Sequence, residues 1–224
     1  MSGTFTWISD PQIWLAALFG AALLLGVSLA QAAAFRSEVD PFAAETSLPV
    51  LEESVVVSAP RGYCIDRLAT LSGQTAAFVL LGSCRAITGD SRAARPETPG
   101  LLTAAVDGSG TQFPSEAELS RFFASDTGRA ALSRSGDPLA MTLGASYNRQ
   151  GVFYLHASES DDTTKQRAQS WRAVFELNGR MVTTTLRDLP GQPIDRDEGF
   201  RTVEQFVRRI RSASPLEQGR LFDE

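Results

Sequence analysis

A long uncharged segment near the N-terminus constrains this chain more than any other feature. The 23 residues from Ile13 to Phe35 carry no charge, and their only polar side chains are Ser28 and Gln31. At about 1.5 Å per residue, a helix of this length crosses a hydrocarbon core of about 30 Å. A buried helix of a globular domain would normally show a polar face. We therefore predict a single N-terminal transmembrane helix at 13–35, preceded by a short tail at 1–12.

A cleaved export signal is the alternative interpretation of this segment. Ala30, Gln31 and Ala32 have the small-x-small form of a signal-peptidase site, so cleavage at Ala32 would release a secreted soluble protein. The apolar run is longer than usual for a signal peptide, and residues 1–12 contain Asp10 but no Lys or Arg. We therefore favour an uncleaved anchor. The flanking charges do not fix its orientation, since Arg36 is the only basic residue nearby.

Cys64 and Cys84 are the only cysteines, and their spacing fits neither a C-x-x-C redox pair nor a structural zinc site. Two cysteines in an exported protein usually form a disulfide. Closing a loop of about twenty residues would stabilise the fold by roughly 3 kcal/mol. The alternative is two unpaired thiols in a cytoplasmic domain. Export and the disulfide support each other, so we predict a single-pass protein of the bacterial inner membrane with its C-terminal domain in the periplasm.

The rest of the chain divides by composition into three parts. Residues 36–53 mix Pro41 and Pro49 with five carboxylates and are predicted to form an acidic linker. Residues 54–212 are predicted to form one globular domain, and residues 213–224 a flexible tail.

Hydrophobic patterns within the domain predict its elements. We expect strands at 54–58, 76–81 and 101–106, a short helix at 65–71 and a loop at 86–100. The strand at 76–81 is apolar throughout and is expected to be buried. Ser115 and Glu118 match a capping box and start a helix that extends towards 132, with a possible break at 126–128.

The second half of the domain alternates as strands do. Residues 139–147 and 152–157 are expected to form one hairpin, and 171–177 and 181–186 another, joined by Asn178 and Gly179 in a type I′ turn. A terminal helix at 197–212 should pack its apolar stripe across this sheet. The fold class is therefore α+β, with an antiparallel sheet packed by two or three helices.

Two pairs of segments resemble a group of uncharacterised envelope proteins of GC-rich bacteria. The first pair is RGYCID at 61–66 with FVLLGSC at 78–84, and the second is WRAVF at 171–175 with NGR at 178–180. The resemblance covers most of the domain and implies no activity. The order of elements is also loosely similar to that of Mog1/PsbP-like sandwiches, which implies a binding or assembly module.

Several chemistries lack the residues that they need. The net charge of −5 gives no basic field for nucleic acid. No G-x-S-x-G, Walker loop, dinucleotide glycine fingerprint or S-x-x-K occurs. His156, the only histidine, lies in an apolar strand and is expected to be a core or sheet-face residue. Pairing with Cys64 as a nucleophile is conceivable, but a disulfide to Cys84 would abolish it.

Acidic groups offer a weak case for metal binding. Glu159, Asp161 and Asp162 lie in a polar stretch typical of a solvated connection, and calcium there is the lesser alternative. Asp195, Asp197 and Glu198 are better explained as the start of a helix. We therefore predict no metal site and no cofactor.

The function that these features favour is non-catalytic. We expect a membrane-anchored envelope protein that serves as a binding or assembly module for a membrane or periplasmic protein complex. The alternative is a carboxylate-dependent hydrolase, which would need a pair such as Asp66 and Asp107 to meet in a cleft. Near the end of the last helix, Arg208, Arg209 and Arg211 suit the helix dipole, and contact with lipid or an acidic partner is the alternative role.

Overall fold

The computed structural model of this chain describes residues 44–108, 112–160 and 167–215. The predicted tail at 1–12 and transmembrane helix at 13–35 lie outside these ranges, as do residues 36–43 of the predicted linker. Within the described ranges, no helix combines the length and the apolar character needed to cross a membrane.

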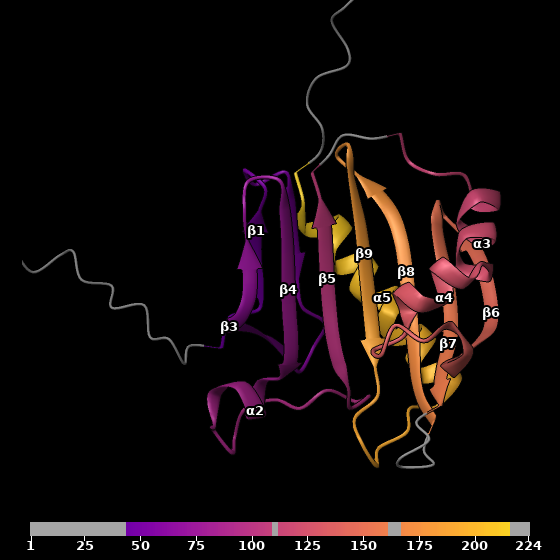
Figure 1. Cartoon of the computed structure of the whole chain (residues 1–224). Helices are drawn as coiled ribbons and strands as arrows, with labels where there is room; N and C mark the ends of the chain where they lie inside the picture. Colours follow the sequence, from indigo (N-terminus) through magenta and orange to yellow (C-terminus); the bar gives the residue numbers. More distant parts are fainter. Residues whose placement is uncertain (1–43, 109–111, 161–166, 216–224) are drawn as a thin grey trace, which may run out of the picture. The chain divides into compact units, whose positions relative to one another are not determined.

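A seven-stranded antiparallel sheet forms the centre of the domain, in the order β3-β4-β5-β9-β8-β7-β6 (Figure 1). Every neighbouring pair is antiparallel, and β6 to β9 form a four-stranded meander that contains the two predicted hairpins. The α+β class with an antiparallel sheet is therefore confirmed. The strands are β3 (Tyr63–Ser72), β4 (Ala76–Ser83), β5 (Leu101–Asp107), β6 (Met141–Arg149), β7 (Val152–Ser160), β8 (Arg167–Leu177) and β9 (Arg180–Arg187).

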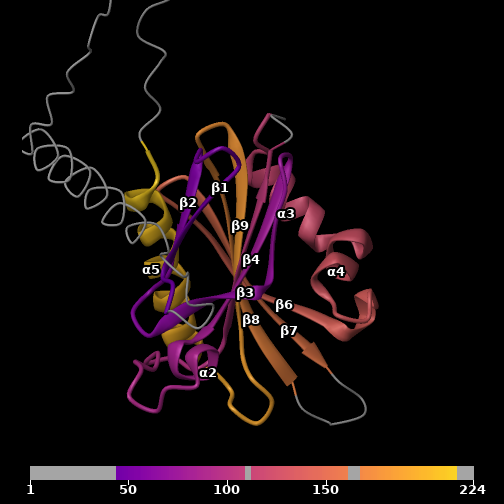
Figure 2. The ribbon, with the colours of Figure 1, turned by 90° about the vertical axis from the view of Figure 1, so that its left-hand side faces the viewer.

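Four α-helices lie in the described ranges, one more than the two or three predicted. They are α2 (Cys84–Thr88), α3 (Glu116–Ala124), α4 (Asp126–Leu132) and α5 (Arg196–Ala213), and a 3₁₀ turn, η1, covers Pro138–Ala140. Figure 2 views the sheet nearly edge-on, with α5 on one side and α3 and α4 on the other. The domain thus has three layers.

A separate hairpin lies in the α5 layer, and it includes residues that were predicted to belong to the linker at 36–53. Strand β1 (Ser47–Val50) pairs with β2 (Val55–Ser58), and Leu48 and Val50 are buried in the main core. Alternate residues of β1 are apolar and are buried against the sheet and α5. The acidic residues around β1 in the sequence obscure this alternating pattern. The folded domain therefore begins before residue 54.

The end of the domain also extends beyond its predicted limit at residue 212. Helix α5 continues to Ala213, and Ser214 is buried. The Ser214 hydroxyl accepts a hydrogen bond from the backbone N–H of Val56 in β2 over 2.9 Å. Residues 213–215 are thus tied to the domain, whereas the rest of the predicted tail lies outside the described residues.

The predicted helix at 65–71 is wrong, because these residues continue β3. Ile65 and Asp66 pair with Leu81 and Leu80 of β4, and the register shifts between Asp66 and Leu71. Hydrogen bonds from the backbone N–H groups of Leu68 and Ala69 to the Asp66 carboxylate shape this irregularity. Leu68 is almost fully exposed at this irregularity, so the apolar spacing of the segment does not reflect burial.

Helix α2 replaces the start of the predicted loop at 86–100. It begins at Cys84 and ends at Gly89, whose φ of 70° lies in the left-handed region that glycine adopts without strain. The elements predicted at 54–58, 76–81 and 101–106 appear as β2, β4 and β5.

The predicted capping box and helix break are both present. Ser115 accepts from the backbone N–H of Glu118, whose carboxylate accepts from the backbone N–H of Ser115. Ser125 then ends α3 and caps α4. A Cβ on Gly128 would lie 1.9 Å from the carbonyl oxygen of Phe122, so only glycine permits this tight junction.

The predicted turn at 178–179 and the predicted apolar face of the last helix are also present. Asn178 and Gly179 have φ values of 52° and 69°, as a type I′ turn requires. Gln150 and Gly151 form the corresponding left-handed pair between β6 and β7. The buried face of α5 contains Val203, Phe206, Val207 and Ile210.

Candidate functional site

The cysteine pair lies at the end of the β3–β4 hairpin. Cys64 of β3 and Cys84 at the start of α2 are bonded, with their Sγ atoms 2.00 Å apart and their Cα atoms 4.6 Å apart. Both residues are buried, and the chain has no free cysteine. The cysteine is therefore unavailable as a nucleophile in this structure.

The two aspartates of the hydrolase hypothesis are not brought together. Asp66 is opposite Leu80 of β4, whereas Asp107 is opposite Ala76. Four residues of β4 separate these positions by about 13 Å along the strand, and β3 and β5 lie about 10 Å apart on either side of it. The Asp66 carboxylate also accepts two backbone hydrogen bonds in the β3 irregularity. This pair cannot share a proton or a water molecule.

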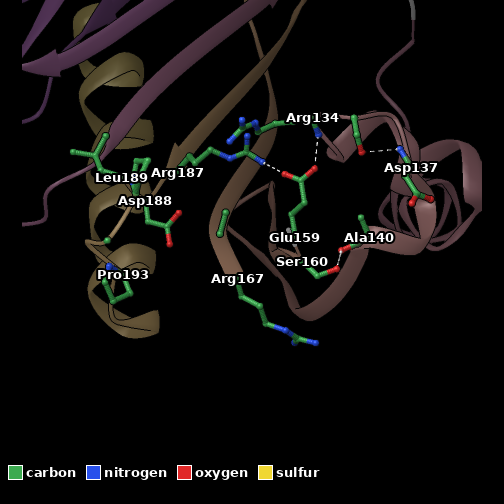
Figure 3. Close-up of a pocket in the computed structure, with 14 residues that line it drawn as sticks. Arg134, Asp137, Ala140, Glu159, Ser160, Arg167, Arg187, Asp188, Leu189 and Pro193 are labelled. Carbon is green, nitrogen blue, oxygen red and sulfur yellow. Dashed lines mark hydrogen bonds and ion pairs between the residues drawn. The ribbon is translucent and has the colours of Figure 1, made fainter. Parts of the chain in front are cut away.

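A pocket of about 920 Å³ lies at the end of β7, β8 and β9, where the segments around 134–140 and 187–193 meet (Figure 3). Glu159 lies in its wall and is buried. Its carboxylate accepts from the Ser133 hydroxyl over 2.7 Å and from the backbone N–H of Arg134 over 2.6 Å. Arg187 donates to the other oxygen over 2.7 Å.

These partners keep Glu159 ionised. Burial pushes its pKa upwards, but the bonds from Ser133 and Arg134 and the charge of Arg187 outweigh burial and hold the pKa below its usual range. A carboxylate with a low pKa and three donors is a poor proton acceptor. Glu159 therefore joins the segment after α4 to the sheet, and the calcium alternative loses its one described ligand.

Asp188 is a second acid at this pocket and behaves differently. Burial raises its pKa, and its carboxylate accepts from the backbone N–H of Gln169 over 3.0 Å. In Figure 3 its carboxyl group lies well apart from that of Glu159, whose carboxylate is bonded to Arg187. The two acids therefore do not form a shared-proton pair. No group of three or more metal-ligating side chains occurs among the described residues, and Asp161 and Asp162 lie outside them.

His156 is part of an aromatic cluster on the α5 side of the sheet. Its ring centroid lies 5.0 Å from that of Trp171, and its Nε2 lies 3.2 Å from Oε1 of Gln169. Phe200 of α5 contacts Trp171 and Tyr154 in the same cluster. These contacts agree with the predicted role of His156 as a sheet-face residue.

The three arginines near the end of α5 have different environments. Arg211 donates to the carbonyl oxygens of Gln150 and Gly151 and lies over the ring of Phe175, so it ties α5 to the β6–β7 turn. Arg208 pairs with Glu204 over 2.9 Å. Arg209 is exposed. The three arginines therefore do not form a shared cationic patch, because the guanidinium of Arg211 is engaged in contacts within the domain. Asp195 caps α5 as predicted, accepting from the backbone N–H groups of Asp197 and Glu198.

One part of the sheet face that bears α3 and α4 is uncovered. Directly opposite residues in an antiparallel sheet point to the same side of the sheet. One row of such residues crosses this face from β7 to β4 and consists of Phe153, Val174, Thr183, Ala105 and Phe78. Phe153 and Val174 are buried beneath α3 and α4, but Phe78 is 39% exposed. We call the uncovered part the open face; its residues are Leu71, Phe78, Leu80, Leu101, Thr103 and Ala105.

Apolar side chains on the open face were missed by sequence reasoning. The run at 76–81 predicts a strand buried on both sides, yet its even-numbered residues face the open side. Leu101, at the start of β5, is 38% exposed, and Leu71 is 71% exposed. No local pattern in these strands indicates that α3 and α4 leave one of their sides uncovered.

A groove of about 710 Å³ follows the border between the open face and α3. On the helix side its wall combines aromatic rings with the polar side chains of Gln112, Ser115 and Glu118, and its floor comes from β8 and β9. The principal lining residues are Phe113, Phe122, Phe123, Arg172, Val174 and Met181.

Arg172 is the unusual member of this lining. Its Nε is buried without a hydrogen-bond acceptor, and none of the ion pairs among the described residues includes its guanidinium. Burial, followed by the positive charge of Arg187, lowers the pKa of Arg172 from 12.5 to about 10. The groove therefore has a charged and incompletely satisfied group in its floor.

Comparisons with known proteins add no family to this description. No protein-family model matches the sequence, and no curated protein matches it. The resemblance to envelope proteins stays a prediction.

Proposed function

We infer that this chain is a non-catalytic, membrane-anchored envelope protein whose periplasmic domain binds a protein of a membrane or periplasmic complex through the open face. The observation that carries the inference is the set of partly exposed apolar side chains on one face of β4 and β5. Phe78 and Leu101 are each more than a third exposed. Exposed apolar residues that lie together on one surface are characteristic of protein interaction sites.

The shape of the sheet supports a surface for a partner. Helices α3 and α4 cover β6, β7 and β8, but they leave the same face of β3, β4 and β5 exposed (Figure 1). Leu80, Thr103 and Ala105 fill the area between the exposed apolar residues with short or apolar side chains. Such a surface loses little polar solvation when it is covered.

The chemistry of the described acids favours binding over catalysis. Glu159 is ionised and fully engaged, and Asp66 and Asp107 are far apart along β4. A carboxylate-dependent hydrolase would need an acid and a base near a common point. The secreted alternative, with cleavage at Ala32, would use the same binding surface without the anchor.

Co-purification of the full-length protein from solubilised membranes tests this function. Leu101→Arg introduces a charge on the open face, and Leu139→Arg is the matched control because Leu139 is 87% exposed in η1, away from that face. We expect a stoichiometric partner to be lost from Leu101→Arg and retained by Leu139→Arg. Equal recovery of the partner with both variants, or no stoichiometric partner with the unmodified protein, would contradict the proposed function.

A further inference from the structure

We propose that the groove beside α3 binds a small amphipathic anion, with its anionic head on Arg172 and its apolar body against Phe113, Phe122 and Met181. This ligand site goes beyond the proposed function. It uses the groove and not the protein-binding open face, so either can be correct without the other.

The first argument is the state of Arg172. A buried arginine is normally held by a carboxylate or by carbonyl oxygens, since an unpaired buried charge is costly. Nε of Arg172 has neither kind of acceptor. Glu159, a buried carboxylate on this side of the sheet, already accepts from Arg187, Ser133 and Arg134. An incoming anion would supply the missing acceptor.

The position of Arg172 makes this acceptor site accessible. Arg172 is opposite Leu155 of β7 and Thr185 of β9, so it points to the same side of the sheet as α3. Thr185 lies towards the open face, and Leu155 lies in the core beneath α3 and α4. Arg172 keeps part of its surface exposed although its Nε is buried. A head group can therefore reach the guanidinium from the groove.

The groove also matches an apolar body of limited size. Its volume of about 710 Å³ falls in the usual range for small-molecule sites. Phe122 is 44% exposed on the helix side, and Met181 lies in the floor. A thioether and an aromatic ring adapt well to a flexible hydrocarbon chain.

The charges around the groove favour a single anionic group. Arg172 is the only basic residue in the lining, so two or three phosphates would lack counter-charges. Glu118 is the one acid in the lining, and its carboxylate is engaged by the backbone N–H and the hydroxyl of Ser115. The chemistry shared by the candidate ligands is thus one carboxylate or phosphate attached to one hydrocarbon chain.

Equilibrium dialysis of radiolabelled octanoate tests the site on the full-length protein held in a non-ionic amphipol, with amphipol alone as the blank. We expect one saturable site. Arg172→Met should weaken octanoate binding by about tenfold or more, because the charge-assisted hydrogen bonds are lost. Arg209→Met removes an exposed arginine of α5 and should leave the affinity unchanged.

A neutral ligand and a wall variant separate the role of charge from that of shape. Octanol should bind weakly and equally to the unmodified protein and Arg172→Met. Phe122→Ser should weaken both octanoate and octanol. Thermal unfolding of each variant shows whether it is folded. Absence of saturable octanoate binding to the unmodified protein, or equal octanoate affinity in a folded Arg172→Met variant, would overturn the proposal.

Competition distinguishes a fatty acid from an anionic phospholipid. Dodecanoate and dodecanoyl-lysophosphatidylglycerol have the same chain and different heads. Displacement of octanoate at a lower concentration of the lysolipid identifies a phospholipid as the preferred source, and the reverse order identifies a fatty acid. Failure of both to displace octanoate would count against the site.

Discussion

Arg187 of β9 reaches across β8 and donates a hydrogen bond of 2.7 Å to Glu159 of β7. The two strands are not neighbours, so this ion pair ties together three strands at the end of the sheet. The carboxylate also holds Ser133 and the backbone of Arg134, which lie just after α4. One buried acid thus connects the sheet with the layer that forms the α3 groove.

The contribution of Glu159 to the free energy of unfolding should depend on pH in a defined direction. The folded pKa is below that of the unfolded chain, so Glu159 contributes stability that is present above about pH 4.5 and is lost as the pH falls through the folded pKa. We expect Glu159→Gln to lower the free energy of unfolding by about 2 kcal/mol at pH 7 and by much less in acid. Urea unfolding across this pH range measures the difference.

Asp188→Asn is the matched control for Glu159→Gln, because the pKa of Asp188 is shifted in the opposite direction from that of Glu159. Burial raises the pKa of Asp188, so the ionised form is disfavoured in the fold and the unmodified protein gains from Asp188 as the pH falls. The amide oxygen can still accept from Gln169. Asp188→Asn should therefore cost no stability at pH 7. A pH-independent loss from Glu159→Gln would contradict the assigned charge state.

Loss of the disulfide should destabilise the hairpin of β3 and β4. The bond joins residues 20 apart in sequence, and replacing both Cys64 and Cys84 with alanine should lower the free energy of unfolding by about 3 kcal/mol. Guanidinium unfolding of oxidised, reduced and doubly substituted protein measures this. Mass spectrometry under non-reducing conditions that finds two free thiols in the protein isolated from cells would refute the bond.

Arg172→Met should stabilise the protein in the absence of a ligand. Methionine has a similar length and removes a buried charge whose Nε has no acceptor. Replacement of buried charges by apolar residues of similar volume is often stabilising, and we expect a gain of about 1 kcal/mol or more. Thermal unfolding at low and high salt measures it. A loss of stability would mean that the guanidinium is satisfied in solution.

A fusion of alkaline phosphatase after Glu224 tests the predicted location. The enzyme is active only where its own disulfides form, so activity is expected if the domain is periplasmic. A matched cytoplasmic reporter at the same position should be inactive. The opposite pattern would place the domain in the cytoplasm.

Local sequence signals predicted much of the fold. Asn178 and Gly179 specify a tight turn by their tolerance of positive φ, and Ser115 and Glu118 specify a helix start by hydrogen bonds within one turn. The spacing of Cys64 and Cys84 argued against a redox pair and a zinc site, and the disulfide was predicted together with export, with two unpaired thiols as the alternative. Each of these signals acts over a few residues or through a single bond.

Features that depend on distant partners were not predictable in the same way. Leu48 and Val50 are buried because β1 pairs with β2 and packs on the sheet, but their surroundings in sequence are acidic. Phe78 is exposed because none of the helices in the described part of the chain covers β4 on that side. The environment of Arg172 depends on how far α3 and α4 extend over β8 and β9, which no local pattern records.

Photocrosslinking in living cells tests most directly whether the open face binds a protein. A photoreactive amino acid at Phe78 or Leu101 should give the same discrete crosslinked product, and the same residue at Leu139 should not. Adding Ala105→Arg in the middle of the open face should abolish the product. Products that form equally at Leu139, or that persist with Ala105→Arg, would contradict the claim that the open face is the binding surface.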